Sequence, residues 1–220
     1  MHRLLLCCII MTISFELFSQ EKMIVKDSYP GSTFYDGFSK HVISLEELPP
    51  QITLNLKGSL SKYFGELRHN IIFEDGQKVD LKKYFLKNKE VFNMRWIVPK
   101  YDLNFSLGDS SLGLVKYNIN ARLDEYGQII QINWPKKNHN VRTNFLDRKE
   151  IEQFALKYAK KKGLETDSYS VNLKYNLEVD KLCWVFRFPL APNQYNTFEI
   201  AWVGNLEVLT EYESRFIVVN

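Results

Sequence analysis

The sequence predicts an α+β fold built as two successive units, each with a helix packed on an antiparallel meander sheet. In the second half of the chain, apolar residues first recur with the period of a helix and then alternate with the period of a strand. In the first half, a similar alternation runs through residues 101–134 and is interrupted by turn residues. Such alternation is typical of a sheet that buries one face and leaves the other in water.

The C-terminal helix is expected over residues 150–162. Asp147, followed three residues later by Glu150, forms an Asp version of the capping box, which satisfies free backbone N–H groups at a helix start. Gly163 supplies the left-handed residue that commonly ends a helix. One apolar stripe runs along this helix and comprises Ile151, Phe154, Ala155, Tyr158 and Ala159.

Four short strands are expected after this helix. They cover Tyr169–Tyr175, Leu182–Phe188, Tyr195–Val203 and Leu206–Leu209. In the first two strands every second residue is apolar. This pattern predicts a meander with one face on the helix.

The first half of the chain also shows helix and strand signals. Helical spacing is shared by Leu60, Tyr63, Phe64 and Leu67. Asp75-Gly76 between two apolar runs predicts a tight hairpin. Strands are expected at Arg95–Val98, Tyr101–Leu107, Val115–Leu123 and Ile129–Trp134.

The two meanders correspond to each other in sequence. The correspondence pairs Tyr101–Asn104 with Tyr169–Asn172 as first strands and places Gly127 and Gly204 in equivalent turns. It leaves Tyr195–Val203 as a strand added in the second copy. We therefore expect an internal duplication, and the alternative is that two generic meanders share the same alternation by chance.

Residues 1–19 have the pattern of a secretory signal peptide. A short basic start precedes the apolar run Leu4–Ile13, and Ser19 stands before the expected cut at Gln20. The run is shorter than the roughly 20 apolar residues that span a bilayer, so no transmembrane segment is expected in the mature chain. The alternative is a buried N-terminal strand or helix.

The rest of the chain is expected to divide in two. An N-terminal unit covers residues 20–140 and a C-terminal unit covers residues 141–220, with the boundary in the polar stretch Lys136–Thr143. Hydrophobic residues make up 45% of the chain and aromatic residues 14%, which suffices for packed cores. The net charge of +3 is too small to indicate nucleic acid as a partner.

The C-terminal unit resembles the PepSY-like family of small secreted bacterial domains, which have a cystatin-like α+β shape. The resemblance is carried by Glu150–Gly163, Tyr169–Tyr175, Trp184-Val185-Phe186 and Asn205–Leu209. In the first unit, Asp124–Ile129 is similar to the family's Asp-x-x-Gly-x-Ile turn, whereas the second unit has no Asp before Gly204. The resemblance implies a non-catalytic binding or inhibitory module of the cell envelope.

Residues that carry catalysis or bind metals are sparse. His41, His69 and His139 have neither each other nor a cysteine at the spacing of a zinc site, so we expect no metal and no cofactor. Cys183 is the one cysteine outside the leader, and we expect a buried, inert thiol rather than a nucleophile. The carboxylates expected on the solvated face of the last strands are Glu207, Glu211 and Glu213.

These observations favour a protein that binds without catalysis, exported to the periplasm or the extracellular space. We expect its partner to be another envelope or secreted protein, and its role to be inhibitory toward a protease or another envelope protein. The binding surface expected from alternation is an exposed strip of Phe198, Ile200 and Trp202 beside an open strand edge. The alternatives are a structural or assembly component of the envelope and, less favoured, a hydrolytic enzyme.

Overall fold

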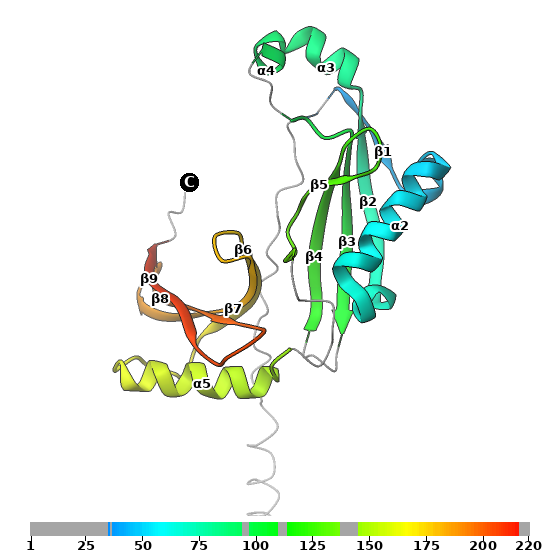
Figure 1. The fold of residues 1–220 in the computed structure, drawn as a ribbon. Coiled ribbons are helices and arrows are strands. Elements are labelled where there is room, and N and C mark those ends of the chain that lie inside the picture. Colours follow the sequence, from blue (N-terminus) through cyan, green and yellow to red (C-terminus); the bar gives the residue numbers. More distant parts are fainter. Residues whose placement is uncertain (1–34, 36, 94–96, 110–113, 137–144, 216–220) are drawn as a thin grey trace, which may run out of the picture.

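The computed structural model describes residues 35, 37–93, 97–109, 114–136 and 145–215. Within this part of the chain two antiparallel sheets are formed, one with the strand order β1-β2-β3-β4-β5 and one with the order β6-β7-β8-β9 (Figure 1). The prediction of an α+β fold with helices on antiparallel meanders is thereby confirmed. The expected signal peptide lies outside the described residues, as do Arg95 and Trp96 of one expected strand.

The first unit places a long helix against a five-stranded sheet. Its elements are β1 (Ser39–Val42), η2 (Leu45–Glu47), α2 (Pro50–Phe64), η3 (Gly65–Asn70), β2 (Ile71–Val79), α3 (Leu81–Lys87), α4 (Lys89–Asn93), β3 (Tyr101–Asp109), β4 (Leu114–Leu123) and β5 (Ile129–Ile132). Helix α2 begins at Pro50, where proline's missing N–H costs nothing, and ends before Gly65, whose φ is 48°. The α2 residues that enter the core are Ile52, Leu56, Leu60 and Phe64.

The prediction of a tight hairpin at Asp75-Gly76 is wrong. β2 runs without a turn from Ile71 to Val79 and carries a bulge between Phe73 and Asp75, opposite β3. At Gly76 an added Cβ would lie 2.6 Å from Leu103 Cδ2 and 2.9 Å from the Asp102 carbonyl oxygen. The glycine therefore serves the close approach of β3, a long-range contact that local turn chemistry does not reveal.

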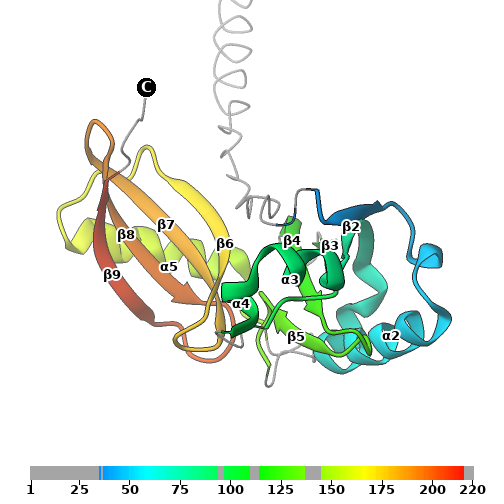
Figure 2. The ribbon, with the colours of Figure 1, turned by 90° about the horizontal axis from the view of Figure 1, so that it is seen from above.

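The second unit places one helix against a four-stranded sheet. Its elements are α5 (Arg148–Lys161), β6 (Ser170–Asn176), β7 (Lys181–Ala191), β8 (Gln194–Ala201) and β9 (Val208–Arg215). The expected helix is confirmed: Asp147 Oδ1 accepts hydrogen bonds from the backbone N–H groups of Lys149 and Glu150, at 2.8 and 3.2 Å. Gly163 follows the helix with a φ of 76°. Helix α5 crosses behind β7 and β8 in Figure 2.

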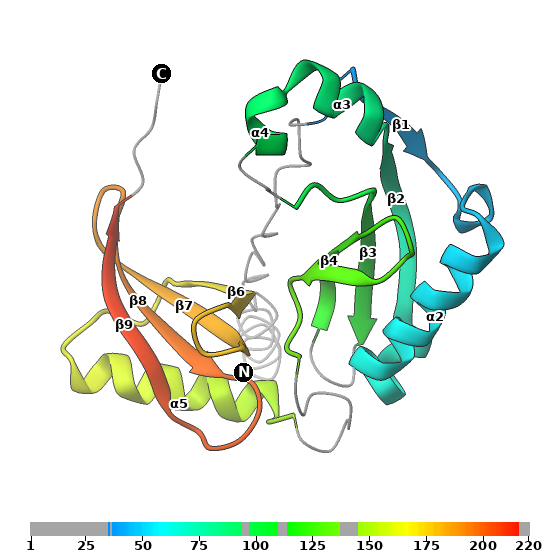
Figure 3. The same cartoon turned by 45° about the horizontal axis from the view of Figure 1, so that its top comes forward.

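The two units lie side by side with β6 nearest the first unit and β9 on the far side (Figure 3). Asp180, at the turn between β6 and β7, joins them: its Oδ1 accepts a hydrogen bond of 3.1 Å from the backbone N–H of Lys136. The same oxygen accepts a hydrogen bond from the Tyr175 hydroxyl at 2.8 Å.

In both units one long helix is followed by four antiparallel strands that pair in sequence order, α2 by β2-β3-β4-β5 and α5 by β6-β7-β8-β9. The first unit differs in having α3 and α4 between β2 and β3. Gly127 and Gly204 both precede the last strand with positive φ, 81° and 99°. The expected correspondence between the two meanders is wrong by one strand. The strand at Tyr101 is the second after its helix, whereas the strand after Tyr169 is the first after its helix. β8 is therefore matched by β4 in position and is not an addition. Common ancestry of the two units stays a prediction.

The expected exposure of Phe198, Ile200 and Trp202 is wrong, since each side chain is 0% exposed. Phe198 and Ile200 share one face of β8, as alternation predicts, and Trp202 follows the strand's last residue. This face meets α5, where the Tyr158 ring packs on Phe198 with centroids 5.0 Å apart. The register pairs Phe198 with Phe186 and Ile200 with Trp184, so the apolar sides of β7 and β8 form one surface. Alternation groups residues by face but does not tell which face the helix covers.

Trp202 should therefore be essential for stability. It packs on Phe145 with ring centroids 4.5 Å apart and on Trp184 at 5.7 Å. We expect Trp202→Ala to lower the free energy of unfolding by about 3–5 kcal/mol, because it removes a large buried side chain and leaves a cavity. Urea unfolding followed by far-ultraviolet circular dichroism measures this.

The matched control is Leu177→Ala at a side chain that is 74% exposed. It should change the unfolding free energy by less than about 0.5 kcal/mol. Equal stability of the Trp202→Ala variant and the unchanged chain would contradict the burial of this ring.

Candidate functional site

The histidines do not form a site in the described part of the chain. His41 lies in β1 and His69 in η3, and both are exposed. His139 lies outside the described residues. Among the residues that the structure describes, no three His, Cys, Asp or Glu side chains come together to hold a metal ion.

Cys183 is a buried thiol on the face of β7 that points away from α5. Its side chain is fully buried, and its Sγ lies 3.9 Å from the Lys181 carbonyl oxygen. Burial, and then the negative charge of Glu199, raise the pKa of Cys183 to about 12. The thiolate, which is the nucleophilic form, is thus strongly suppressed.

Cys183 should resist alkylation in the folded protein. In a chain carrying Cys7→Ser and Cys8→Ser, a maleimide dye at mildly alkaline pH should leave Cys183 unlabelled, and guanidinium chloride should restore full labelling. Mass spectrometry reads out both states. Labelling of the native chain at the rate of the unfolded chain would contradict the burial of this thiol.

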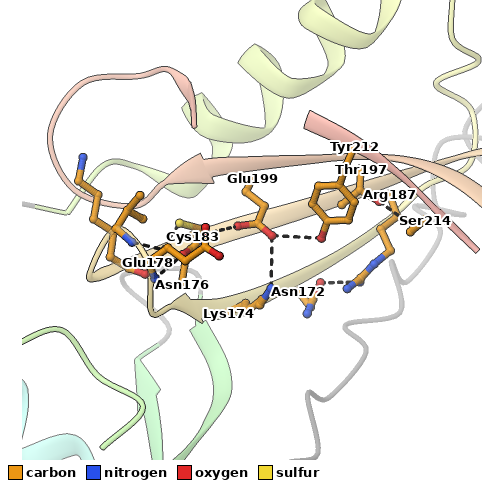
Figure 4. Close-up of polar contacts among 12 residues, drawn as sticks. Asn172, Lys174, Asn176, Glu178, Cys183, Arg187, Thr197, Glu199, Tyr212 and Ser214 are labelled. Atoms are coloured by element: carbon orange, nitrogen blue, oxygen red, sulfur yellow. Dashed lines mark hydrogen bonds and ion pairs between the residues drawn. The ribbon is translucent and has the colours of Figure 1, made fainter. Parts of the chain in front are cut away.

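A polar network covers the same face of the second sheet (Figure 4). At its centre the Glu199 carboxylate, 2% exposed, accepts hydrogen bonds from Asn176 Nδ2 at 2.8 Å and the Tyr212 hydroxyl at 3.1 Å. Lys174 Nζ lies 3.4 Å from the same carboxylate. Three donors from β6 and β9 thus converge on one buried anion.

The network extends along the sheet beyond Glu199. Arg187 Nη1 donates to Asn172 Oδ1 at 2.6 Å, and the hydroxyls of Thr197 and Ser214 lie 3.0 Å apart. All four strands of the second sheet contribute to these contacts (Figure 4). These polar groups are paired with one another, whereas the buried Thr210 Oγ1, opposite Glu199 on β9, has no hydrogen-bond partner among the described residues. Because its paired groups come from neighbouring strands, the network is suited to joining the strands.

Glu199 stays ionised despite its burial. Burial alone would raise the pKa of its carboxyl group, but the donors Asn176, Lys174 and Tyr212 outweigh burial, and the net pKa is lowered. Apolar alternation did not single out this residue, although the sequence carries a signal for it: a single acid inside the apolar run from Phe198 to Trp202.

Glu199→Gln should destabilise the protein in a pH-dependent way. At neutral pH the loss should be about 1–3 kcal/mol, because the charge-assisted hydrogen bonds are replaced by weaker ones. A lowered folded-state pKa contributes stability above the ordinary value of 4.5, and that contribution is lost as the pH falls through the folded-state pKa. Urea unfolding of both chains from neutral to acidic pH should show the difference shrinking below about pH 4.5.

The matched control is Glu207→Gln, at an exposed carboxylate of the turn before β9. It should change the unfolding free energy by less than about 0.5 kcal/mol at every pH. An equal pH dependence of the unfolding free energy for the two variants would contradict the central role of Glu199 in the network.

A second polar network lies on the first sheet, on the face away from α2. Asp102 accepts hydrogen bonds from Asn120 Nδ2 at 2.5 Å and from Arg122 Nε at 3.3 Å. Asn104 Nδ2 donates to Asp75 Oδ1 at 2.7 Å. These groups are also satisfied within the sheet.

The first unit has a hollow at the edge of its sheet, where β1 ends before β2 does. β1 pairs with β2 only from Val42, opposite Gly76, to Ser39, opposite Val79. β2 begins at Ile71, so residues 71–75 extend beyond its ladder with β1. The chain leaves the sheet after Val42 and enters η2.

A capping box diverts the chain at this point. Glu47 Oε1 accepts hydrogen bonds from the backbone N–H groups of Ile43 and Ser44, at 2.9 and 3.0 Å. Ser44 Oγ accepts in return from the backbone N–H of Glu46 at 3.2 Å. These contacts fix η2 and direct the chain toward α2, away from β2.

The diversion leaves an open groove of about 700 Å³, which we call the β2 groove. Its lining residues are Ile43, Ser44, Leu45, Glu46, Leu48, Pro50, Thr53, Leu54, Lys57 and Phe73. Ile43 is 72% exposed and Leu54 63%. The β2 groove therefore offers exposed apolar side chains to a segment that enters it.

Two charged side chains belong to the lining. Glu46 comes from η2 and Lys57 from the second turn of α2. In the part of the chain that the structure describes, neither side chain forms an ion pair. A ligand in the β2 groove would therefore lie beside both charges.

Comparison of the chain with family models, curated proteins and solved structures finds no match. The resemblance to PepSY-like domains therefore stays a prediction. No helix among the described residues is long and apolar enough to cross a membrane.

Proposed function

We propose that the chain is a non-catalytic binding module that captures an extended segment of another envelope or secreted protein in the β2 groove. The observation that carries this proposal is the strand position beside residues 71–75, which β1 leaves after Val42 and which opens into an apolar hollow. The β2 groove replaces the strip of Phe198, Ile200 and Trp202 as the candidate binding surface, because those side chains are buried.

A segment added beside β2 would gain from two sources. Main-chain hydrogen bonds along a strand supply affinity without regard to sequence, and pockets for alternate side chains supply specificity. Here the pockets would be formed by Ile43, Leu54 and Phe73. Covering one such apolar side chain typically contributes on the order of 1–2 kcal/mol.

The two alternatives differ in what supports them. Cys183 does not support the alternative of a hydrolytic enzyme, because its burial and its raised pKa oppose nucleophilic attack. A structural or assembly component would use the same β2 groove for self-association, so experiment must separate it from capture of a partner.

The signal-peptide pattern of residues 1–19 supports export. An inhibitory role toward a protease or another envelope protein remains part of the proposal.

Selection of displayed peptides tests the proposal. A library of short linear peptides is selected against the full chain, and the enriched peptides are expected to alternate apolar and polar residues. Leu54→Asp should weaken their binding at least about tenfold, because the carboxylate would lose its hydration on contact with an apolar side chain. Fluorescence anisotropy of labelled peptides measures the loss.

The matched control is Leu177→Asp, at a leucine of the second unit that is 74% exposed, against 63% for Leu54. It should leave peptide binding unchanged. Enriched peptides that bind the Leu54→Asp chain as tightly as the original chain would rule out the β2 groove. A dimer in sedimentation analysis that Leu54→Asp dissociates would favour the assembly component instead.

A further inference from the structure

We infer that the β2 groove takes its segment antiparallel to β2, with a basic side chain near the segment's amino end and an acidic one near its carboxyl end. This inference rests on the proposed function and adds the direction and charge pattern of the ligand. It follows from three features of the first unit: the direction of β1, the direction of α2 and the two charges of the groove lining.

The sheet sets the direction. All pairings in the first sheet are antiparallel, including that of β1 with β2. The position beside residues 71–75 continues the line of β1 past Val42. A segment placed there runs in the direction of β1, with its amino end toward Val42 and its carboxyl end toward Ile71. Antiparallel pairing is also the more stable geometry per residue.

Helix α2 carries the charges along the same axis. It starts at Pro50, beside η2 and the end of β1, and leads through η3 into Ile71 at the start of β2. It therefore runs opposite to β2, as Figure 1 shows. The hydroxyl of Thr53 donates to the Leu45 carbonyl oxygen at 3.1 Å and holds η2 against the first turn of α2.

The two charges consequently lie toward opposite ends of the β2 groove. Glu46 belongs to η2 at the end near Val42, and Lys57 lies two turns along α2 toward the Ile71 end. A segment that runs antiparallel to β2 meets the carboxylate first and the ammonium group last. The complementary ligand is therefore basic, then apolar at alternate positions, then acidic.

Charges at the rim of a site govern orientation more than total affinity. Exposed ion pairs contribute little each, while like charges placed opposite each other are unfavourable. A segment of reversed charge order would meet two repulsions in place of two attractions. The charges of Glu46 and Lys57 thus select one ligand polarity while the apolar lining supplies most of the binding.

Two peptides of identical composition test the inference. The forward peptide is Lys-Thr-Val-Thr-Val-Thr-Glu and the swapped peptide is Glu-Thr-Val-Thr-Val-Thr-Lys, both acetylated and amidated so that only the side chains carry charge. Alternation places both charges and both valines of each peptide on one face. Binding to the full chain is measured by fluorescence anisotropy and by nitrogen-15 chemical-shift titration up to millimolar peptide.

The forward peptide should bind about tenfold more tightly than the swapped peptide, since two attractions replace two repulsions. The variant carrying both Glu46→Lys and Lys57→Glu should reverse this preference. Leu54→Asp should abolish binding of both peptides. Added salt should narrow the difference between the peptides, because exposed charges are screened.

The outcomes separate this inference from the proposed function. The two peptides could bind equally tightly, with Leu54→Asp abolishing the binding of both. That result would overturn the charge pattern but would leave capture in the β2 groove standing. Tighter binding of the swapped peptide would overturn the direction. Binding that survives Leu54→Asp would overturn both proposals. No binding at millimolar concentration would overturn the charge pattern as a ligand rule, while the library selection would still decide the function.

Discussion

The structure depends on one packing constraint: each sheet has a large apolar face that its own helix must cover. In the second unit the aromatic side chains of β7 and β8 point to α5 because Phe198 pairs with Phe186 and Ile200 with Trp184. Moving the register by one residue would expose these rings and bury Glu199 against the helix. The register therefore decides at once where the core lies and where the polar side chains gather.

The polar character of each sheet's other face, away from its helix, follows from that constraint. Once the apolar residues are committed to the helix, the intervening polar residues of neighbouring strands lie beside one another and must satisfy one another. In the second sheet they meet around Glu199, and in the first around Asp102. A network with its donors and acceptors paired adds stability and specificity to strand pairing but leaves little for a ligand. The candidate site accordingly lies at a strand edge and not on a sheet face.

The features that the sequence predicted depend on local signals, whereas those that it missed depend on contacts between residues far apart in the chain. Helix α5 was predicted because its cap at Asp147, its apolar period and its stop at Gly163 are local signals. The side of β8 that meets the core and the role of Gly76 were missed, since both depend on partner strands far along the chain. The β2 groove was also missed, because it arises where β1 and β2, separated by α2, stop pairing.

The contrast between the units identifies the feature that makes the groove. Both have a helix followed by a four-stranded meander, but only the first has a strand placed before its helix on the edge of the sheet in the described residues. If that strand continued past Val42, it would cover residues 71–75. The Glu47 carboxylate prevents this by holding the N–H groups of Ile43 and Ser44 in the turn into η2. A local capping interaction thus leaves open a position that the rest of the sheet is built to pair.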